Sequence, residues 1–179
     1  MKLYHYIAKP NTALKEGILS FANNPNADLR YYHKRSGETT HDGIVKWFES
    51  CFEGRSRAIR GFSEPIQWTN KSVNMFKPFI ENADLFSIDL EALAKDGLIE
   101  AVYVSPAMHP DKDKDLLQGV DEILVRLDSI NDIDTSPVDW SVCDENLGLR
   151  FSVVPYYLIV LKGGVIPPEY IKLESIDKS

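Results

Sequence analysis

Cysteine is scarce in this sequence, and long apolar runs are missing from it. The chain has only Cys51 and Cys143 in 179 residues, which gives neither a disulfide framework nor a pair of metal ligands. No segment approaches the ~20 consecutive apolar residues of a membrane-spanning helix, and Met1 to Ala8 lack the apolar run of a signal peptide. The sequence therefore predicts a cytoplasmic protein without a membrane partner, with leaderless export left open.

Positive charge is also in short supply. Twenty Lys and Arg residues stand against 27 Asp and Glu residues, for a net charge of −7. Such a balance repels a phosphate backbone and excludes general nucleic-acid binding by a basic surface. The densest basic group is Arg55, Arg57 and Arg60. It is interpreted either as a solvated cluster at a helix end or as a clasp for a diphosphate.

Several motifs that carry chemistry are absent. There is no glycine-rich phosphate loop, because Gly163 and Gly164 alone make a turn. The spacing of His33 and His41 is not that of helical metal ligands, so no metal site is expected. Asp111, Asp113 and Asp115 could hold a hard cation in a hydrolase. This reading ranks last, since lysines alternate with the aspartates and would compete with the ion.

What is present is ordinary globular composition, with 44% hydrophobic and 26% charged residues. One α+β domain over residues 1–179 is expected. Its five or six strands form one mixed sheet, and three or four helices flank that sheet. Strands or extended segments are predicted at 3–8, 57–68, 85–88, 99–105, 121–127, 151–161 and 165–173. Helices are predicted at 12–16, 42–53, 90–96 and from Thr69 onward. Residues 20–42 are predicted to form a long surface loop, with a turn of helix left open within it.

Local signals fix some boundaries. Thr40 or Asp42 is expected to cap the helix that ends near Glu53, and Asp89 to cap the helix at 90–96. Pro167 and Pro168 place the last strand at a sheet edge, because proline cannot donate to a ladder.

The opening strand carries Tyr4, His5 and Tyr6, and a short helix ending at Gly17 follows it. A histidine at a strand end can offer a ring nitrogen to a ligand hydroxyl or amide. This pattern resembles the beginning of ADP-ribosyltransferase-like domains of the His–Tyr–Glu type. The resemblance implies that His5 contacts the ribose of NAD and that the backbone of Tyr6 lies near the nicotinamide amide. The plain alternative is a half-buried histidine that bonds only to backbone.

Two further segments resemble the same family. Phe62 and Ser63 resemble its nicotinamide-packing element, although the family's tyrosine is missing there, and Arg60 precedes them as a candidate cofactor contact. Glu122, at the start of an apolar strand, resembles the catalytic glutamate that stabilises the oxocarbenium-like transition state. The alternatives are turn chemistry for Ser63 and a solvated strand-edge charge for Glu122.

The resemblance implies a mixed, mostly antiparallel sheet split around a cleft and flanked by helices. It implies a transferase that moves ADP-ribose from NAD to a macromolecular acceptor, expected to be a protein. The final segment 165–171 also looks like the family's last strand, whereas 128–148 has no counterpart and is interpreted as an insertion. The alternative function is a non-catalytic interaction, immunity or regulatory protein on the same scaffold.

Overall fold

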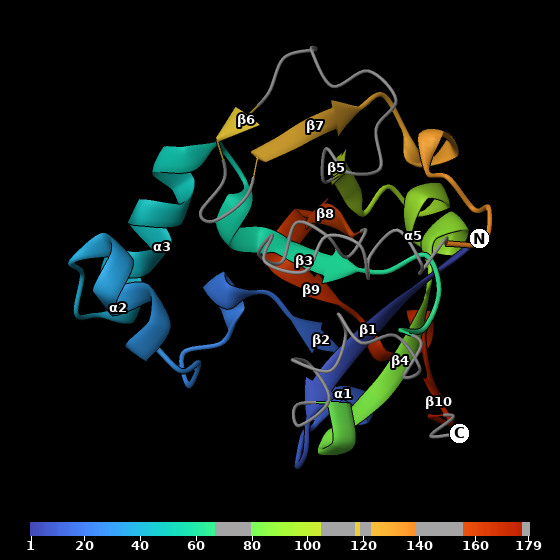
Figure 1. Ribbon diagram of the computed structural model, residues 1–179, viewed down its shortest axis with the longest axis horizontal. Helices are drawn as coiled ribbons and strands as arrows, with labels where there is room; N and C mark the ends of the chain where they lie inside the picture. The colour runs from blue at the N-terminus through green and yellow to red at the C-terminus, as the bar shows by residue number, and fades with distance from the viewer. Residues whose placement is uncertain (67–79, 105–116, 119–122, 139–155, 177–179) are drawn as a thin grey trace.

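The strands of the protein pair only antiparallel in the part of the chain that the structure describes (Figure 1). The structure is a computed structural model that describes residues 1–66, 80–104, 117–118, 123–138 and 156–176. Antiparallel sheets with few helices confirm the predicted α+β class. The strands belong to three sheets, however, rather than to the single sheet that was expected.

The largest sheet has five strands. In spatial order they are β3 (Ala58–Gly61), β8 (Tyr157–Leu161), β5 (Ile99–Val104), β7 (Ile123–Leu127) and β6 (Leu117–Gln118). Every residue of β8 is buried, because strands flank it on both sides and side chains cover both its faces. Its apolar and aromatic sequence suits that position.

Two smaller sheets complete the set. One consists of β1 (Lys2–Ala8), β4 (Ala83–Asp89) and β10 (Ile171–Glu174), with β4 in the middle. The other is the short pair of β2 (Ile18–Leu19) and β9 (Val165–Ile166). Leu3 of β1 and Ile59 of β3 both belong to the main core, which also contains Leu90 and Leu93. The three-stranded and five-stranded sheets therefore share one core.

The helices in the described part of the chain are short, and only some of them start at expected caps. They are α1 (Ala13–Glu16), α2 (Arg30–Ser36), α3 (His41–Cys51) and α5 (Leu90–Lys95), with 3₁₀ turns η1 (Phe21–Asn23), η2 (Arg55–Arg57), η5 (Ile130–Asp132), η7 (Lys162–Gly164) and η8 (Pro168–Tyr170). The Thr40 hydroxyl accepts from Gly43 N and the Asp89 carboxylate accepts from Ala92 N, each at 3.0 Å. Among the described residues, no helix has the length and apolarity to cross a membrane.

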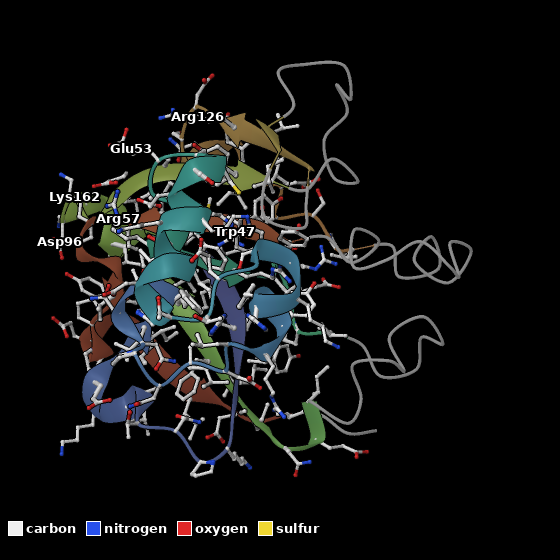
Figure 2. The ribbon with its side chains drawn as sticks, turned by 90° about the vertical axis from the view of Figure 1, so that its left-hand side faces the viewer. Trp47, Glu53, Arg57, Asp96, Arg126 and Lys162 are labelled. Carbon is white, nitrogen blue, oxygen red and sulfur yellow. The ribbon has the colours of Figure 1, made fainter. Side chains whose placement is uncertain are left out.

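Helices α2 and α3 form a layer at the left of Figure 1, and Figure 2 views the molecule from that side. The sequence predicted a long loop with no more than a turn of helix before Thr40, yet the seven-residue helix α2 forms there. Its Tyr32 packs against Phe48 and Trp47 of α3, with ring centroids 4.9 and 6.4 Å apart. This aromatic packing stabilises a helix that has no apolar periodicity of its own.

The predicted last strand, 165–173, is interrupted. Val165–Ile166 pairs with β2, Ile171–Glu174 pairs with β4, and the η8 turn lies between them. The proline pair is the physical reason, since Pro167 and Pro168 supply no N–H and have a fixed φ. Both pieces are nevertheless edge strands, as expected.

Several sequence predictions concern residues outside the described part of the chain. These are Glu122, the helix from Thr69, the aspartates at 111, 113 and 115, and Cys143. The proposed insertion is described as far as Val138. Within it, Ile133 is buried in the main core, and the N–H of Asp134 donates to the Tyr157 hydroxyl at 3.1 Å. This first half of the segment is therefore part of the packed fold.

Gly61 allows β3 to approach β1 closely. A Cβ atom at this position would lie 2.9 Å from both Cβ and Cδ1 of the buried Leu3. We expect Gly61→Ala to lower the free energy of unfolding by about 1–3 kcal/mol through overpacking. Chemical denaturation measures this. In a Leu3→Ala background the same change should cost less, because Cδ1 is gone; an equal cost in both backgrounds would contradict the assignment.

Candidate functional site

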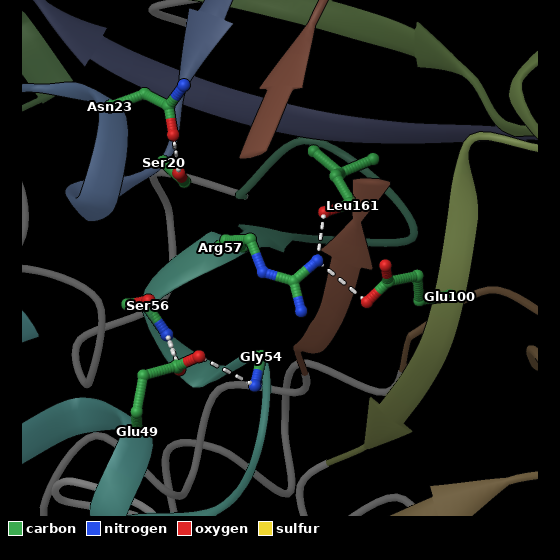
Figure 3. A network of polar contacts seen from close by, with 8 residues as sticks. All are labelled: Ser20, Asn23, Glu49, Gly54, Ser56, Arg57, Glu100 and Leu161. Carbon is green, nitrogen blue, oxygen red and sulfur yellow. Dashed lines mark hydrogen bonds and ion pairs between the residues drawn. The ribbon is translucent and has the colours of Figure 1, made fainter. Parts of the chain in front are cut away.

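The segment that carries Arg60, Phe62 and Ser63 is held in place by two charged side chains upstream of it (Figure 3). The Glu49 carboxylate accepts from Gly54 N at 3.1 Å and from Ser56 N at 3.0 Å, which fixes the turn after α3. Arg57 then donates to Glu100 Oε2 at 2.7 Å and to the Leu161 carbonyl at 3.1 Å. These bonds set the start of β3 against β5 and β8.

The three arginines of the basic group have separate surroundings. Arg55 is buried with its guanidinium 5.1 Å from the centroid of Phe48, and Arg57 pairs with Glu100. The Arg60 guanidinium lies 4.3 Å from the centroid of the Tyr156 ring. The solvated helix-end cluster does not describe this arrangement, because Arg55 is buried and Arg57 has an ion-pair partner. The diphosphate clasp stays a prediction.

Strands β1 and β3 meet at one backbone rung. Tyr4 N donates to the Phe62 carbonyl at 2.8 Å, and Phe62 N donates to the Tyr4 carbonyl at 2.9 Å. In an antiparallel ladder the next such rung would join Tyr6 and Arg60. Instead, Nδ1 of His5 lies 2.6 Å from the Arg60 carbonyl oxygen. A side chain therefore occupies the acceptor that the next rung would use.

Because the His5 side chain takes the place of this rung, the backbone of Tyr6 has no hydrogen-bond partner on that side among the described residues. In an antiparallel ladder a residue's N–H and C=O point to the same side, and alternate residues point the same way. Tyr4 directs both groups away from β4 and toward Phe62, so Tyr6 also directs both groups away from β4. No residue in the described ranges supplies a partner for them. A donor and an acceptor thus lie side by side on one residue.

His5 is a neutral imidazole with a defined tautomer. A carbonyl only accepts, so Nδ1 carries the proton and Nε2 has a lone pair. Burial lowers the pKa of His5 to about 4, the bond to the Arg60 carbonyl opposes that shift, and the positive charge of Arg60 adds to it. Within the described part of the chain, Nε2 makes no hydrogen bond. His5 can therefore accept a hydrogen bond from a ligand hydroxyl at neutral pH.

Tyr6 and Phe62 bring two rings together beside this edge. Their centroids are 6.2 Å apart at 60°, and the Tyr6 hydroxyl accepts from Ile66 N at 3.0 Å. Burial raises the pKa of Tyr6, so the phenol stays neutral. Phe62 is half-buried and contacts both smaller core clusters.

Ser63 follows, with a polar side-chain atom that no described residue satisfies. Its Oγ is buried and has no hydrogen-bond partner among the residues described. A buried hydroxyl without a partner costs free energy. A ligand that reaches this atom would recover that cost.

The structure thus brings five of the predicted site residues to the junction of β1 and β3: His5, Tyr6, Arg60, Phe62 and Ser63. By strand alternation, however, the His5 side chain shares the Leu3 face of β1, whereas the Tyr6 ring lies on the opposite face. Tyr156, the ring under Arg60, was missed. Leu158 pairs with Arg60. Since side chains two residues apart on a strand share a face, this pairing would have indicated Tyr156 as a neighbour of Arg60.

The depressed pKa of His5 makes stability depend on pH. The unfolded chain binds a proton near the ordinary value of 6.5, and the folded chain binds one near 4. The contribution of His5 is therefore complete above pH 6.5 and decreases as pH falls toward 4, by about 3 kcal/mol.

We expect His5→Asn, whose amide can still donate to the Arg60 carbonyl, to remove this contribution to the pH dependence. Denaturant titrations of both proteins at pH 7 and pH 4 measure the difference, and the other titrating groups cancel in the comparison. Equal losses of stability in the two proteins would disprove a buried neutral His5.

Comparisons of the chain with known protein families, with curated proteins and with solved structures gave no match.

Proposed function

We propose that the protein binds NAD at the junction of β1 and β3 and transfers its ADP-ribose to a macromolecular acceptor. The observation that carries the proposal is the backbone edge of Tyr6, which no described residue pairs, beside the neutral imidazole of His5. The resemblance of the opening segment to ADP-ribosyltransferase-like domains supports the same residues.

The Tyr6 edge fits a primary carboxamide. Nicotinamide offers one carbonyl acceptor and one amino donor side by side, which complement the Tyr6 N–H and C=O as a strand residue would. The Phe62 ring beside this edge offers an aromatic face for the pyridine ring. Ser63 Oγ is the remaining polar atom that a bound ligand would satisfy.

His5 fits a ribose hydroxyl. Nε2 is an acceptor and not a cation at neutral pH, so it favours a neutral donor over a phosphate. Arg60 supplies the positive charge at this junction, and a diphosphate is the anionic part of NAD that it would attract.

Glu122 is the proposed catalytic carboxylate. In the transfer, the bond between ribose C1′ and the nicotinamide nitrogen breaks, and nicotinamide leaves with the electron pair. The acceptor nucleophile forms the new bond to C1′ and loses its proton. An ionised carboxylate near C1′ stabilises the positive charge that develops on the sugar.

The second candidate function is that of a non-catalytic interaction protein. The same Tyr6 edge favours it, because a peptide backbone also presents one acceptor and one donor side by side. In this reading a strand from a protein partner continues β1, and NAD has no role.

The ligand test compares nicotinamide with nicotinic acid by calorimetry. Nicotinic acid has a carboxylate, which cannot donate to the Tyr6 carbonyl, so we expect it to bind about tenfold or more weakly than nicotinamide. His5→Asn should weaken NAD by a similar factor and leave nicotinamide unchanged, since only the ribose contact is lost. The absence of binding to NAD and nicotinamide at millimolar concentration would favour the interaction protein.

The catalytic test is Glu122→Gln, with Asp121→Asn as the matched control. We expect the first variant to lower the rate of NAD turnover by about 100-fold or more, because a transition-state charge is no longer stabilised. NAD affinity should change little in both variants. Equal turnover in the Glu122→Gln variant and the unmodified protein would remove Glu122 from the mechanism.

A further inference from the structure

Strand β10 forms an outer edge of its sheet. It pairs with β4 through Ile171 to Glu174, and in the described part of the chain no strand pairs with its other side. An edge strand presents unpaired N–H and C=O groups that can bind a further strand. The strand is short and regular, without a bulge in its pairing to β4.

The edge strand β10 carries an exposed apolar side chain between two charges of opposite sign. Leu173 is 45% exposed at the middle of the edge, between Lys172 and Glu174. Lys172 is exposed and makes no ion pair with any described residue. Glu174 is half-buried, and its Oε1 accepts from the buried Ser87 hydroxyl at 2.7 Å, which orients the carboxylate before any partner binds.

We propose that β10 pairs antiparallel with β10 of a second copy of the chain, with Leu173 on the two-fold axis. Residues at equal distance from the axis then lie opposite each other. Lys172 of each copy faces Glu174 of the other, and the two Leu173 side chains meet on one face. The two three-stranded sheets become one continuous sheet.

The sequence of β10 selects this register over its neighbour. With the axis moved half a step, Lys172 would face Leu173, and neither charge would have a partner. A lysine on an edge usually discourages pairing with foreign strands. Here the charge pattern is self-complementary, so the same lysine that opposes other partners favours a second copy.

Exposed apolar surface near the edge supports the same partner. Leu14 is 61% exposed, and its helix α1 packs against β10 and η8. Two of the three exposed large hydrophobic residues in the described part of the chain, Leu14 and Leu173, thus belong to elements at this edge. Pairing would remove part of that surface from water.

The test is sedimentation equilibrium over a wide range of protein concentration. We expect the unmodified protein to dimerise, and Lys172→Glu and Glu174→Lys to weaken the dimer by about tenfold or more each, because each places like charges opposite one another twice. A mixture of the two variants should form a heterodimer. In it, both acidic side chains of the Lys172→Glu chain face the two lysines of the Glu174→Lys chain. The double variant should dimerise again, and Lys95→Glu, on α5, serves as a control with the dimer unchanged.

Circular dichroism of each variant checks that the chain is folded, and heterodimer formation proves it for the two single variants. The proposal is overturned if the unmodified protein is a monomer at submillimolar concentration. It is also overturned if the single variants dimerise as tightly as the unmodified protein, or if their mixture does not associate. None of these outcomes depends on NAD.

Discussion

Where β1 and β3 meet, a hydrogen bond from a side chain replaces a backbone hydrogen bond of the ladder. His5 donates Nδ1–H to the Arg60 carbonyl at 2.6 Å, directly beyond the single rung between Tyr4 and Phe62. The three-stranded and five-stranded sheets are joined there by these hydrogen bonds. Because the imidazole uses the carbonyl that the Tyr6 N–H would otherwise bond, the backbone of Tyr6 has no partner on that side among the described residues, and the candidate site follows from that substitution.

The position of that carbonyl depends on contacts further along the chain. Glu49 fixes the turn after α3, and Arg57 ties the start of β3 to β5 and β8. Gly61 then lets Leu3 pack against the strand. These contacts hold the strand that carries the Arg60 carbonyl, although none of them belongs to the site itself.

Local signals in the sequence predicted the class and many boundaries of the fold. Thr40 and Asp89 cap helices because short side-chain oxygens satisfy the free N–H groups of a first turn, a rule that needs no tertiary information. Helix α2 was missed because its stability comes from rings on another helix. The site was predicted in part. His5 and Phe62 have side chains whose chemistry is visible in the sequence, and the Tyr6 backbone entered only through the family resemblance. The role of the Arg60 carbonyl had no sequence signature, because it is a backbone group. The partners of the arginines, such as Glu100 for Arg57, are likewise distant in the sequence.

The segment after β7 has a structural consequence of its own. Ile133 fills a place in the main core, and the N–H of Asp134 satisfies the buried Tyr157 hydroxyl on the central strand β8. Removal of 128–138 would leave an apolar void and a phenol without its donor under the strand that pairs with β3. Both contacts lie next to Tyr157, which pairs with Gly61 of β3. The segment therefore supports the strand against which the candidate site is built.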